Sequence, residues 1–136
     1  MPNIRVGSAV LVERDGKILL GARGKEPGYG NIIIPGGGVN LYEDFRNTAH
    51  REIMEEAGVE ITNLRQIGAF QIIDPEHEQH RVIIYWHADW ASGEPTPSSD
   101  LLTAKFWSRA EIASGVAAGT INTITLDVLT ATGWVL

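Results

Sequence analysis

Three glutamates stand close together in one segment of the sequence: Glu52, Glu55 and Glu56. Each residue advances by about 100° around an α-helix, so on a helix these side chains fall within an arc of roughly 100°. Like charges at this spacing repel one another and weaken a helix. Hard divalent cations such as Mg²⁺ and Mn²⁺ prefer carboxylate oxygens as ligands. The spacing leaves two interpretations, a metal site or a solvated acidic face, and helix geometry alone favours the acidic face.

The helix that would position these glutamates is predicted over residues 43–57. Acidic Glu43 and Asp44 suit its first turn, and Gly58 suits a position just past its end. Arg51 is the nearest basic residue and is expected to point to a neighbouring face. Apolar residues recur every four positions and form a narrow stripe for burial: Phe45, Ala49, Ile53 and Ala57.

Three consecutive glycines, residues 36–38, precede this helix. Glycine permits positive φ and a tight approach of the backbone, as a loop packed against a metal–phosphate site requires. A triple glycine by itself is more often an ordinary turn. Together with the acidic helix, however, the glycines outweigh the interpretation as a solvated face.

The glycines and the helix together reproduce a known spacing pattern. The chain reads Gly37, five residues, Glu43, seven residues, Arg51-Glu52-Ile53, one residue, Glu55-Glu56, one residue and Gly58-Val59. This segment resembles the complete Nudix box, and so many fixed positions at fixed separations make a strong signal. The resemblance covers about a sixth of the chain. It implies an α/β fold, the Nudix α/β/α sandwich with a mixed central sheet and one catalytic helix after a glycine-rich loop.

The resemblance also implies the metal ligands. Glu52, Glu55 and Glu56 would bind Mg²⁺ or Mn²⁺, and Gly37 would contribute a backbone carbonyl. Asp100 is a candidate for a further ligand, because many family members carry acidic residues before the equivalent of residues 105–107; a loop cap is its alternative role.

The family pattern assigns catalytic roles to the same segment. Arg51, paired with Glu43, would orient the metal-binding carboxylates. The implied reaction is attack by water on a phosphorus of a nucleoside-diphosphate-linked substrate. Glu55 and Glu56 are the preferred helix candidates for the base, and a carboxylate from a downstream loop is the alternative.

Four residues are candidates for contact with the substrate. Arg23 would contact phosphate, with a salt bridge at the rim as the alternative. Tyr29 and Phe70 could stack on a base or belong to the core. His80 could touch a base or ribose, or have no role.

The preferred substrate is a (deoxy)nucleoside triphosphate, hydrolysed to monophosphate and pyrophosphate. Nucleotide-sugar or ADP-ribose pyrophosphatase activity is the alternative, because such enzymes share the metal helix. A non-catalytic nucleotide-binding Nudix module is expected to lose box carboxylates, and none is missing here.

Outside the box, the pattern of apolar residues predicts a mixture of strands and helices. A hairpin turn is expected at Asp15-Gly16. Loops are expected at 23–30, 74–79 and 91–100, and residues 35–38 are expected to stop the strand before them. The predicted strands are 4–12, 17–22, 32–34, 64–73, 81–90 and 105–107, and the further helices are 109–114 and 122–130. The threonines and isoleucines of the last segment fit a strand as well.

Length and composition fit a single domain over residues 1–136, with 43% apolar residues. The net charge of −6 argues against a nucleic-acid polymer as ligand, but a metal ion can adapt an acidic site to a small nucleotide. No apolar run is long enough for a bilayer, and the N-terminus lacks the pattern of a secretory signal, so a cytoplasmic protein without a membrane partner is expected. The absence of cysteine rules out disulfides and a thiol nucleophile. The family resemblance leaves a homodimer open.

Overall fold

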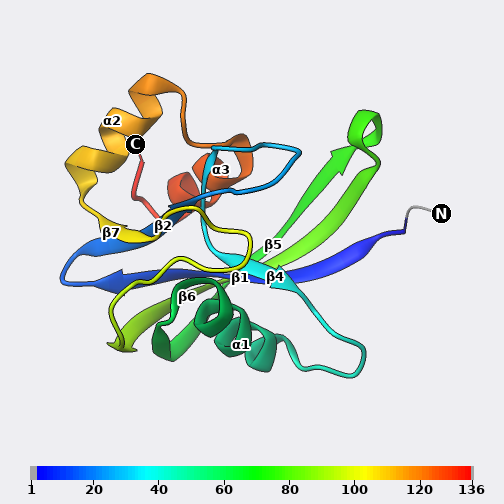
Figure 1. Ribbon diagram of the computed structural model, residues 1–136, viewed down its shortest axis with the longest axis horizontal. Coiled ribbons are helices and arrows are strands. Elements are labelled where there is room, and N and C mark those ends of the chain that lie inside the picture. The colour runs from blue at the N-terminus through cyan, green and yellow to red at the C-terminus, as the bar shows by residue number, and fades with distance from the viewer. Residues whose placement is uncertain (1–2, 136) are drawn as a thin grey trace.

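The structure is a computed structural model that describes residues 3–135. A mixed sheet forms its centre, with the strand order β3-β2-β1-β6-β5, while β4 pairs with β1 and β7 with β2 (Figure 1). The strands β1 and β6 run parallel, and the other pairs are antiparallel. The strands are β1 (Arg5–Arg14), β2 (Lys17–Ala22), β3 (Ile32–Ile33), β4 (Gly36–Gly38), β5 (Glu60–Asp74), β6 (Gln79–Ser92) and β7 (Lys105–Trp107).

Helices cover both faces of the sheet, which confirms the predicted α/β/α sandwich (Figure 1). Helix α1 (Phe45–Ala57) lies on one face, and α2 (Arg109–Ala118) and α3 (Thr123–Ala131) lie on the other. A 3₁₀ turn, η1 (Pro75–His77), joins β5 to β6. None of the helices in the described part of the chain is long and apolar enough to cross a bilayer.

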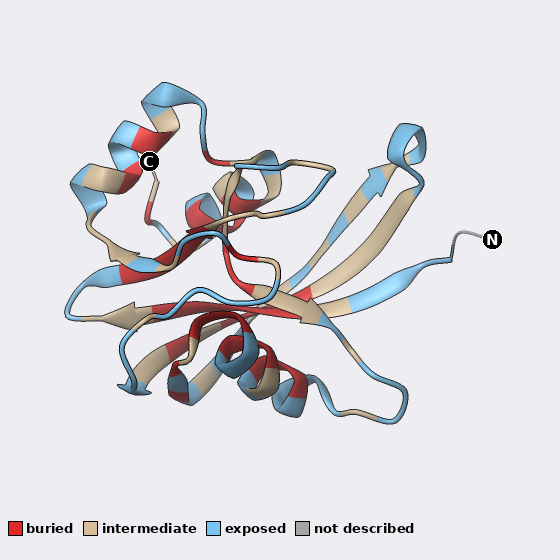
Figure 2. Ribbon diagram, viewed as in Figure 1, coloured by how far each residue is buried: buried red, intermediate tan, exposed pale blue. Residues whose placement is uncertain are grey.

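Two apolar cores follow from the alternation of side chains along β1. Leu11 packs into the core that includes residues of α2 and α3, whereas Val10 and Val12 pack into the core beneath α1. Figure 2 shows the burial concentrated in the middle of the sheet and on the sheet-facing side of α1. The sheet therefore fixes where α1 can lie, and with it the acidic side chains.

Helix α1 begins two residues later than the sequence predicts. Asp44 is its N-cap, with extended backbone and a side chain that accepts a hydrogen bond from the amide of Arg46, so neither Asp44 nor Glu43 lies in the first turn. Gly58 ends the helix in the left-handed conformation, as predicted. Phe45 is 43% exposed, so the first member of the predicted apolar stripe lies outside the core.

Several predicted boundaries also change. The glycines 36–38 form strand β4 against β1, which corrects the prediction that they only stop a strand. The β5–β6 pair extends over residues predicted as loop, because the two strands continue their ladder almost to η1. Helix α2 runs four residues past its predicted end, to its glycine C-cap, while the helix predicted at 122–130 is confirmed as α3.

Candidate active site

The carboxylate of Glu52 lies directly over Gly37, where α1 packs against β4. A Cβ added at Gly37 would come within 2.3 Å of the Glu52 carboxyl carbon, so any other residue there would displace the Glu52 carboxylate. Positive φ is not the reason, since none of the three glycines of β4 has it. The glycine strand thus permits a close approach between the backbone and an acidic side chain.

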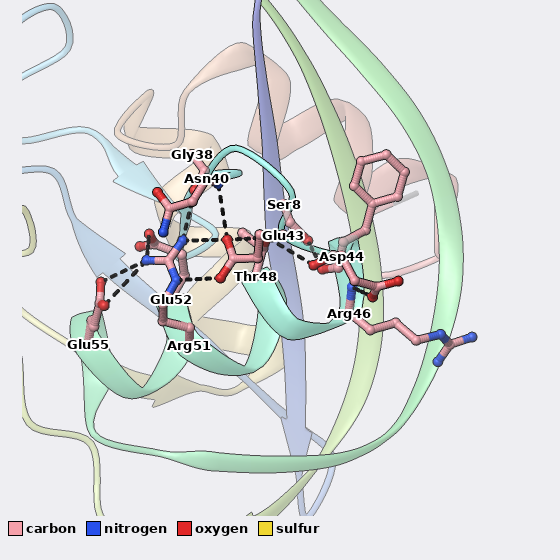
Figure 3. A network of polar contacts seen from close by, with 11 residues as sticks. Ser8, Gly38, Asn40, Glu43, Asp44, Arg46, Thr48, Arg51, Glu52 and Glu55 are labelled. Carbon is pink, nitrogen blue, oxygen red and sulfur yellow. Dashed lines mark hydrogen bonds and ion pairs between the residues drawn. The ribbon is translucent and has the colours of Figure 1, made fainter.

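Arg51 is the centre of the polar network in this region (Figure 3). Its Nε and Nη2 each donate a hydrogen bond of 2.8 Å to the Glu43 carboxylate. Its Nη1 lies 2.7 Å from a Glu52 oxygen and 3.1 Å from a Glu55 oxygen, and Nη2 also donates to the Gly38 carbonyl at 2.9 Å. Arg51 was expected to point to a face next to the glutamates, but its long side chain curves back across them, and its pair with Glu43 is the one that the family resemblance implies.

Glu43 holds this arginine firmly although it lies outside the helix. The hydrogen bonds from Arg51, then from the Thr48 hydroxyl at 2.7 Å and the Asn40 amide, lower the pKa of Glu43 to about 2. The same contact with Glu43 is the main reason why the pKa of Arg51 is raised. Both partners stay charged at every pH at which the protein would work. Thr48 is fully buried and was not predicted from the sequence.

Glu56 is in a different environment from its neighbours. It is only 5% exposed, and burial, followed by repulsion from Asp100 and Glu52, raises its pKa to about 7. The charge of Lys25 offsets part of this effect, but Lys25 forms its own ion pair with Asp100 at 2.8 Å. Within residues 3–135, none of the ion pairs involves Glu56. A buried carboxylate of this kind favours a proton or an external cation.

Glu52 and Glu55 complete the acidic face and differ in exposure. Burial is the main reason why the pKa of Glu52 is raised, against the opposing hydrogen bond from Arg51. The side chain of Glu55 is 53% exposed and contacts Arg51. One arginine thus serves three carboxylates, and Glu56 remains without a partner in this network. The donor set of buried carboxylate oxygens and an excess of negative charge fits a hard divalent cation.

A second acidic group lies far from the helix, at the turn between β5 and β6. Asp74, Glu76 and His77 are, among the described residues, the group of three whose ligand atoms lie within 4.8 Å of one another. Their contacts have a structural explanation, because Asp74 caps η1 and its carboxylate binds the His77 ring at 2.7 Å. Close spacing of ligand atoms alone is therefore a poor guide to a metal site here, and burial without an ion-pair partner distinguishes Glu56.

The four candidate substrate residues lie in different environments. The Nε of Arg23 donates to the Pro27 carbonyl at 2.7 Å, and no ion pair of the described chain includes Arg23, so its alternative as a rim salt bridge is not observed. Tyr29 is 60% exposed and is not a core residue. Phe70 packs against the core and meets the Tyr85 ring edge-on at 5.5 Å. His80 is partly buried in β6.

Asp100 and Arg81 have neighbours that are distant in the sequence. Asp100 lies near Lys25 and Glu56, and Arg81 lies near Arg5 and Arg23. The side chain of Asp100 binds Lys25 rather than capping its own loop, and its charge acts on Glu56. Arg81 is partly buried on β6, and its pKa is lowered by burial and by the charges of Arg23 and Arg5. Sequence reasoning missed Arg81, although its alternation with Ile83 and Tyr85 would have placed it on an inward face.

The fold and the glycine-backed acidic helix define an architecture shared with a solved Nudix structure. The MutT NUDIX hydrolase from Burkholderia pseudomallei superposes with a TM-score of 0.75 and 26% identity, over 88% of this chain and 99% of that one. The family model described as NUDIX domain matches residues 1–125. The chain belongs to the Nudix family.

Three curated relatives differ in the substrates that their names state. The NAD-capped RNA hydrolase NudC of Pseudomonas aeruginosa is 32% identical over 106 residues, 78% of this chain and 36% of that protein. The oxidized purine nucleoside triphosphate hydrolase of Danio rerio is 36% identical over 94 residues, which are 68% of this chain and 59% of that protein. The ADP-ribose pyrophosphatase of Methanocaldococcus jannaschii is 31% identical over 97 residues, which are 71% of this chain and 57% of that protein. The chain thus spans about a third of the first relative's length and less than two thirds of the other two.

Proposed function

We propose that this chain is a Mg²⁺-dependent pyrophosphohydrolase that converts a (deoxy)nucleoside triphosphate to the monophosphate and pyrophosphate. The observation that carries the proposal is Glu56, which is largely buried, forms no ion pair within residues 3–135 and keeps its carboxylate oxygens accessible, on the same helix as Glu52 over Gly37. A helix face of this kind is costly for stability unless a cation is recruited to it. Membership of the Nudix family supplies the reaction class.

The ion would be held by Glu52, Glu55 and Glu56, with the Gly37 carbonyl as a backbone ligand. Mn²⁺ would fit the same oxygen donors. When bound, the ion supplies charge neutralisation at phosphate oxygens and a more acidic bound water. Asp100 would approach as a further ligand only if its ion pair with Lys25 opens.

The network around Arg51 positions the carboxylates. Two hydrogen bonds to Glu43 fix the plane of the guanidinium, and its Nη1 then holds Glu52 and Glu55 on the same side. Side chains locked in this way lose little conformational entropy when a ligand arrives. Arg51 and Glu43 are thus positioning residues in the proposed mechanism.

The proton acceptor is Glu55 or Glu56, whose environments differ. Glu56 is buried, which raises its pKa to about 7 in the metal-free protein, and a bound cation would lower that pKa again. Glu55 is exposed and is held by Arg51. The pH dependence of kcat in Glu55→Gln and Glu56→Gln would separate the two, because only loss of the acceptor removes the acidic limb of the profile.

A nucleoside triphosphate is preferred as substrate on one comparison, because the Danio rerio relative is named for triphosphates. Arg23 would contact phosphate, while Tyr29, Phe70 and His80 would contact the nucleoside. ADP-ribose or a nucleotide sugar is the alternative, favoured by the name of the Methanocaldococcus jannaschii relative. A non-catalytic module is disfavoured, because every carboxylate of the box is present.

A substrate screen with product identification tests the proposal. Nucleoside triphosphates, ADP-ribose, nucleotide sugars and NAD would be incubated with Mg²⁺, with Mn²⁺ or with EDTA, and products separated by ion-exchange chromatography. We expect triphosphate turnover that EDTA abolishes, and a loss of at least about 100-fold in Glu56→Gln. Glu60→Gln, an exposed carboxylate on β5, is the matched control. Undiminished turnover in EDTA, or in Glu56→Gln, would contradict the proposal.

A further inference from the structure

Arg81 on β6 lies beside Arg5 on β1, because these two residues are partners in the parallel ladder. Residues paired in this way project from the same face of the sheet. On that face Arg81 is followed by Ile83 and Tyr85, which belong to the core under α2 and α3. The Arg81 guanidinium is partly buried, and its Nε and Nη2 donate to the side-chain oxygen of Gln79 at 2.9 and 2.7 Å. Its protein partner is therefore a neutral amide.

Positive charge surrounds Arg81 without a carboxylate to balance it. Both Arg23 and Arg5 lie close enough for their charges to disfavour the charged form of Arg81, in addition to its burial. None of the ion pairs within residues 3–135 includes Arg5, Arg23 or Arg81. A partly buried guanidinium among like charges destabilises the fold unless an anion joins it. One neutral hydrogen-bond acceptor does not offset that repulsion.

Arg5 connects this group of arginines to the acidic site. Arg5 lines an open groove whose other walls include Glu43 and Glu52. On the opposite side, Arg23 opens the loop that carries Lys25, and the charge of Lys25 acts on Glu56. Two clusters of opposite sign therefore border one region of the molecule.

We propose that Arg81, together with Arg5 and Arg23, binds a phosphate group of the substrate that lies beyond the linkage cleaved at the carboxylate site. The inference rests on the proposed function for the identity of the substrate. A guanidinium offers a planar fork of donors that matches two phosphate oxygens. The subsite selects triphosphates over substrates whose distal group is a neutral sugar.

A purely structural role for Arg81 and a role in anion binding predict different effects of Arg81→Met on stability. If its bonds to Gln79 hold β6 in place, then Arg81→Met lowers the melting temperature. If Arg81 is kept for an anion, the same substitution leaves the melting temperature of the ligand-free protein unchanged or raises it, since methionine keeps the apolar stem and removes the repulsion. Thermal denaturation without ligand therefore separates the two roles.

Binding of inorganic tripolyphosphate to metal-depleted protein is the direct test, since it needs no turnover. Isothermal titration calorimetry would compare the wild type with Arg81→Met, Arg81→Lys and the control Arg65→Met, whose arginine on β5 is paired with Asp89 at 3.3 Å. We expect a loss of about 10- to 100-fold in affinity for Arg81→Met, a smaller loss for Arg81→Lys and none for the control. Equal affinities for the wild type and Arg81→Met would overturn the inference.

Kinetics separates this inference from the proposed function. In Arg81→Met, we expect KM for a nucleoside triphosphate to rise about 10- to 100-fold with little change in kcat, while KM for a nucleotide sugar stays the same. If the wild type hydrolyses no nucleotide, but Arg81→Met still binds tripolyphosphate more weakly than the wild type, the proposed function is wrong and the anion subsite is supported. If KM changes with the nucleobase and not with the number of phosphates, Arg81 reads the base and the phosphate assignment is wrong.

Discussion

The buried carboxylate of Glu56 should make the metal-free protein less stable as the pH rises from about 4.5 to 7. In the unfolded chain this carboxyl releases its proton near its ordinary pKa of 4.5, whereas in the folded protein burial raises the pKa to about 7. Between these values the folded state binds more protons than the unfolded state, so the free energy of unfolding falls with increasing pH. Glu43, with its pKa lowered to about 2, has the opposite effect, but only between pH 4.5 and 2.

The size of the effect follows from the two pKa values. Each tenfold change in proton affinity is worth about 1.4 kcal/mol, so the full difference corresponds to about 3 kcal/mol. Glu56 keeps some contact with solvent, which reduces the expected value to about 2–3 kcal/mol. This is a large share of the roughly 5–15 kcal/mol that stabilises a typical domain. Replacing Glu56 by glutamine removes the charge and should recover that amount at pH 8, with little change at pH 4.

Urea denaturation in EDTA from pH 4 to 8.5 would measure this, with Glu60→Gln as the control for loss of an exposed carboxylate. Other groups titrate in the same range, including His77, whose raised pKa also favours the folded state at low pH. The difference between Glu56→Gln and the wild type isolates Glu56 from them. Mg²⁺ at pH 8 should then stabilise the wild type more than the variant. Stability curves that stay parallel across the pH range would refute the reasoning.

Three further substitutions test the geometry of the site. Gly37→Ala should displace the carboxylate of Glu52 and weaken Mg²⁺ binding in calorimetry by about 10-fold or more, whereas Gly38→Ala, whose Cβ would meet nothing within 4 Å, should not; equal affinities would contradict the packing argument. Arg51→Ala should weaken Mg²⁺ binding by about 10- to 100-fold, because it releases two carboxylates, and an unchanged affinity would exclude a positioning role. Glu55→Gln should abolish turnover while changing the free energy of unfolding by less than about 0.5 kcal/mol, since this side chain is exposed; full Mg²⁺-dependent activity would remove it from the mechanism.

Local sequence patterns were sufficient for the main elements of the fold. The hairpin at Asp15-Gly16, the acidic helix and the strands on either side were predicted from periodicity and turn residues, and the structure confirms them. The start of α1 was misplaced because an acidic residue suits the N-cap as well as the first turn, and only the hydrogen bond from the Asp44 side chain decides between them.

The environment of the glutamates could not be predicted in the same way. A helical projection places Glu52, Glu55 and Glu56 beside the apolar stripe. It does not show that β4 covers Glu52 and leaves Glu55 exposed. That difference depends on the pairing of β4 with β1, which is a long-range contact. The projection also does not show that Glu56 is buried. Likewise, Arg81 meets Arg5 only because two strands far apart in the sequence run parallel.

The two clusters of unbalanced charge restrict the ligand more than either does alone. Buried carboxylates would attract many cations, and a group of arginines would attract many anions. Both Glu56 and Arg81 are costly to bury without a partner of opposite charge. Within residues 3–135 no ion pair involves Glu56 or Arg81, and Arg5 shares its groove with Glu52. A ligand that balances both clusters at once must carry positive charge at one end and negative charge at the other, which is the charge distribution of a divalent metal ion bound to a polyphosphate.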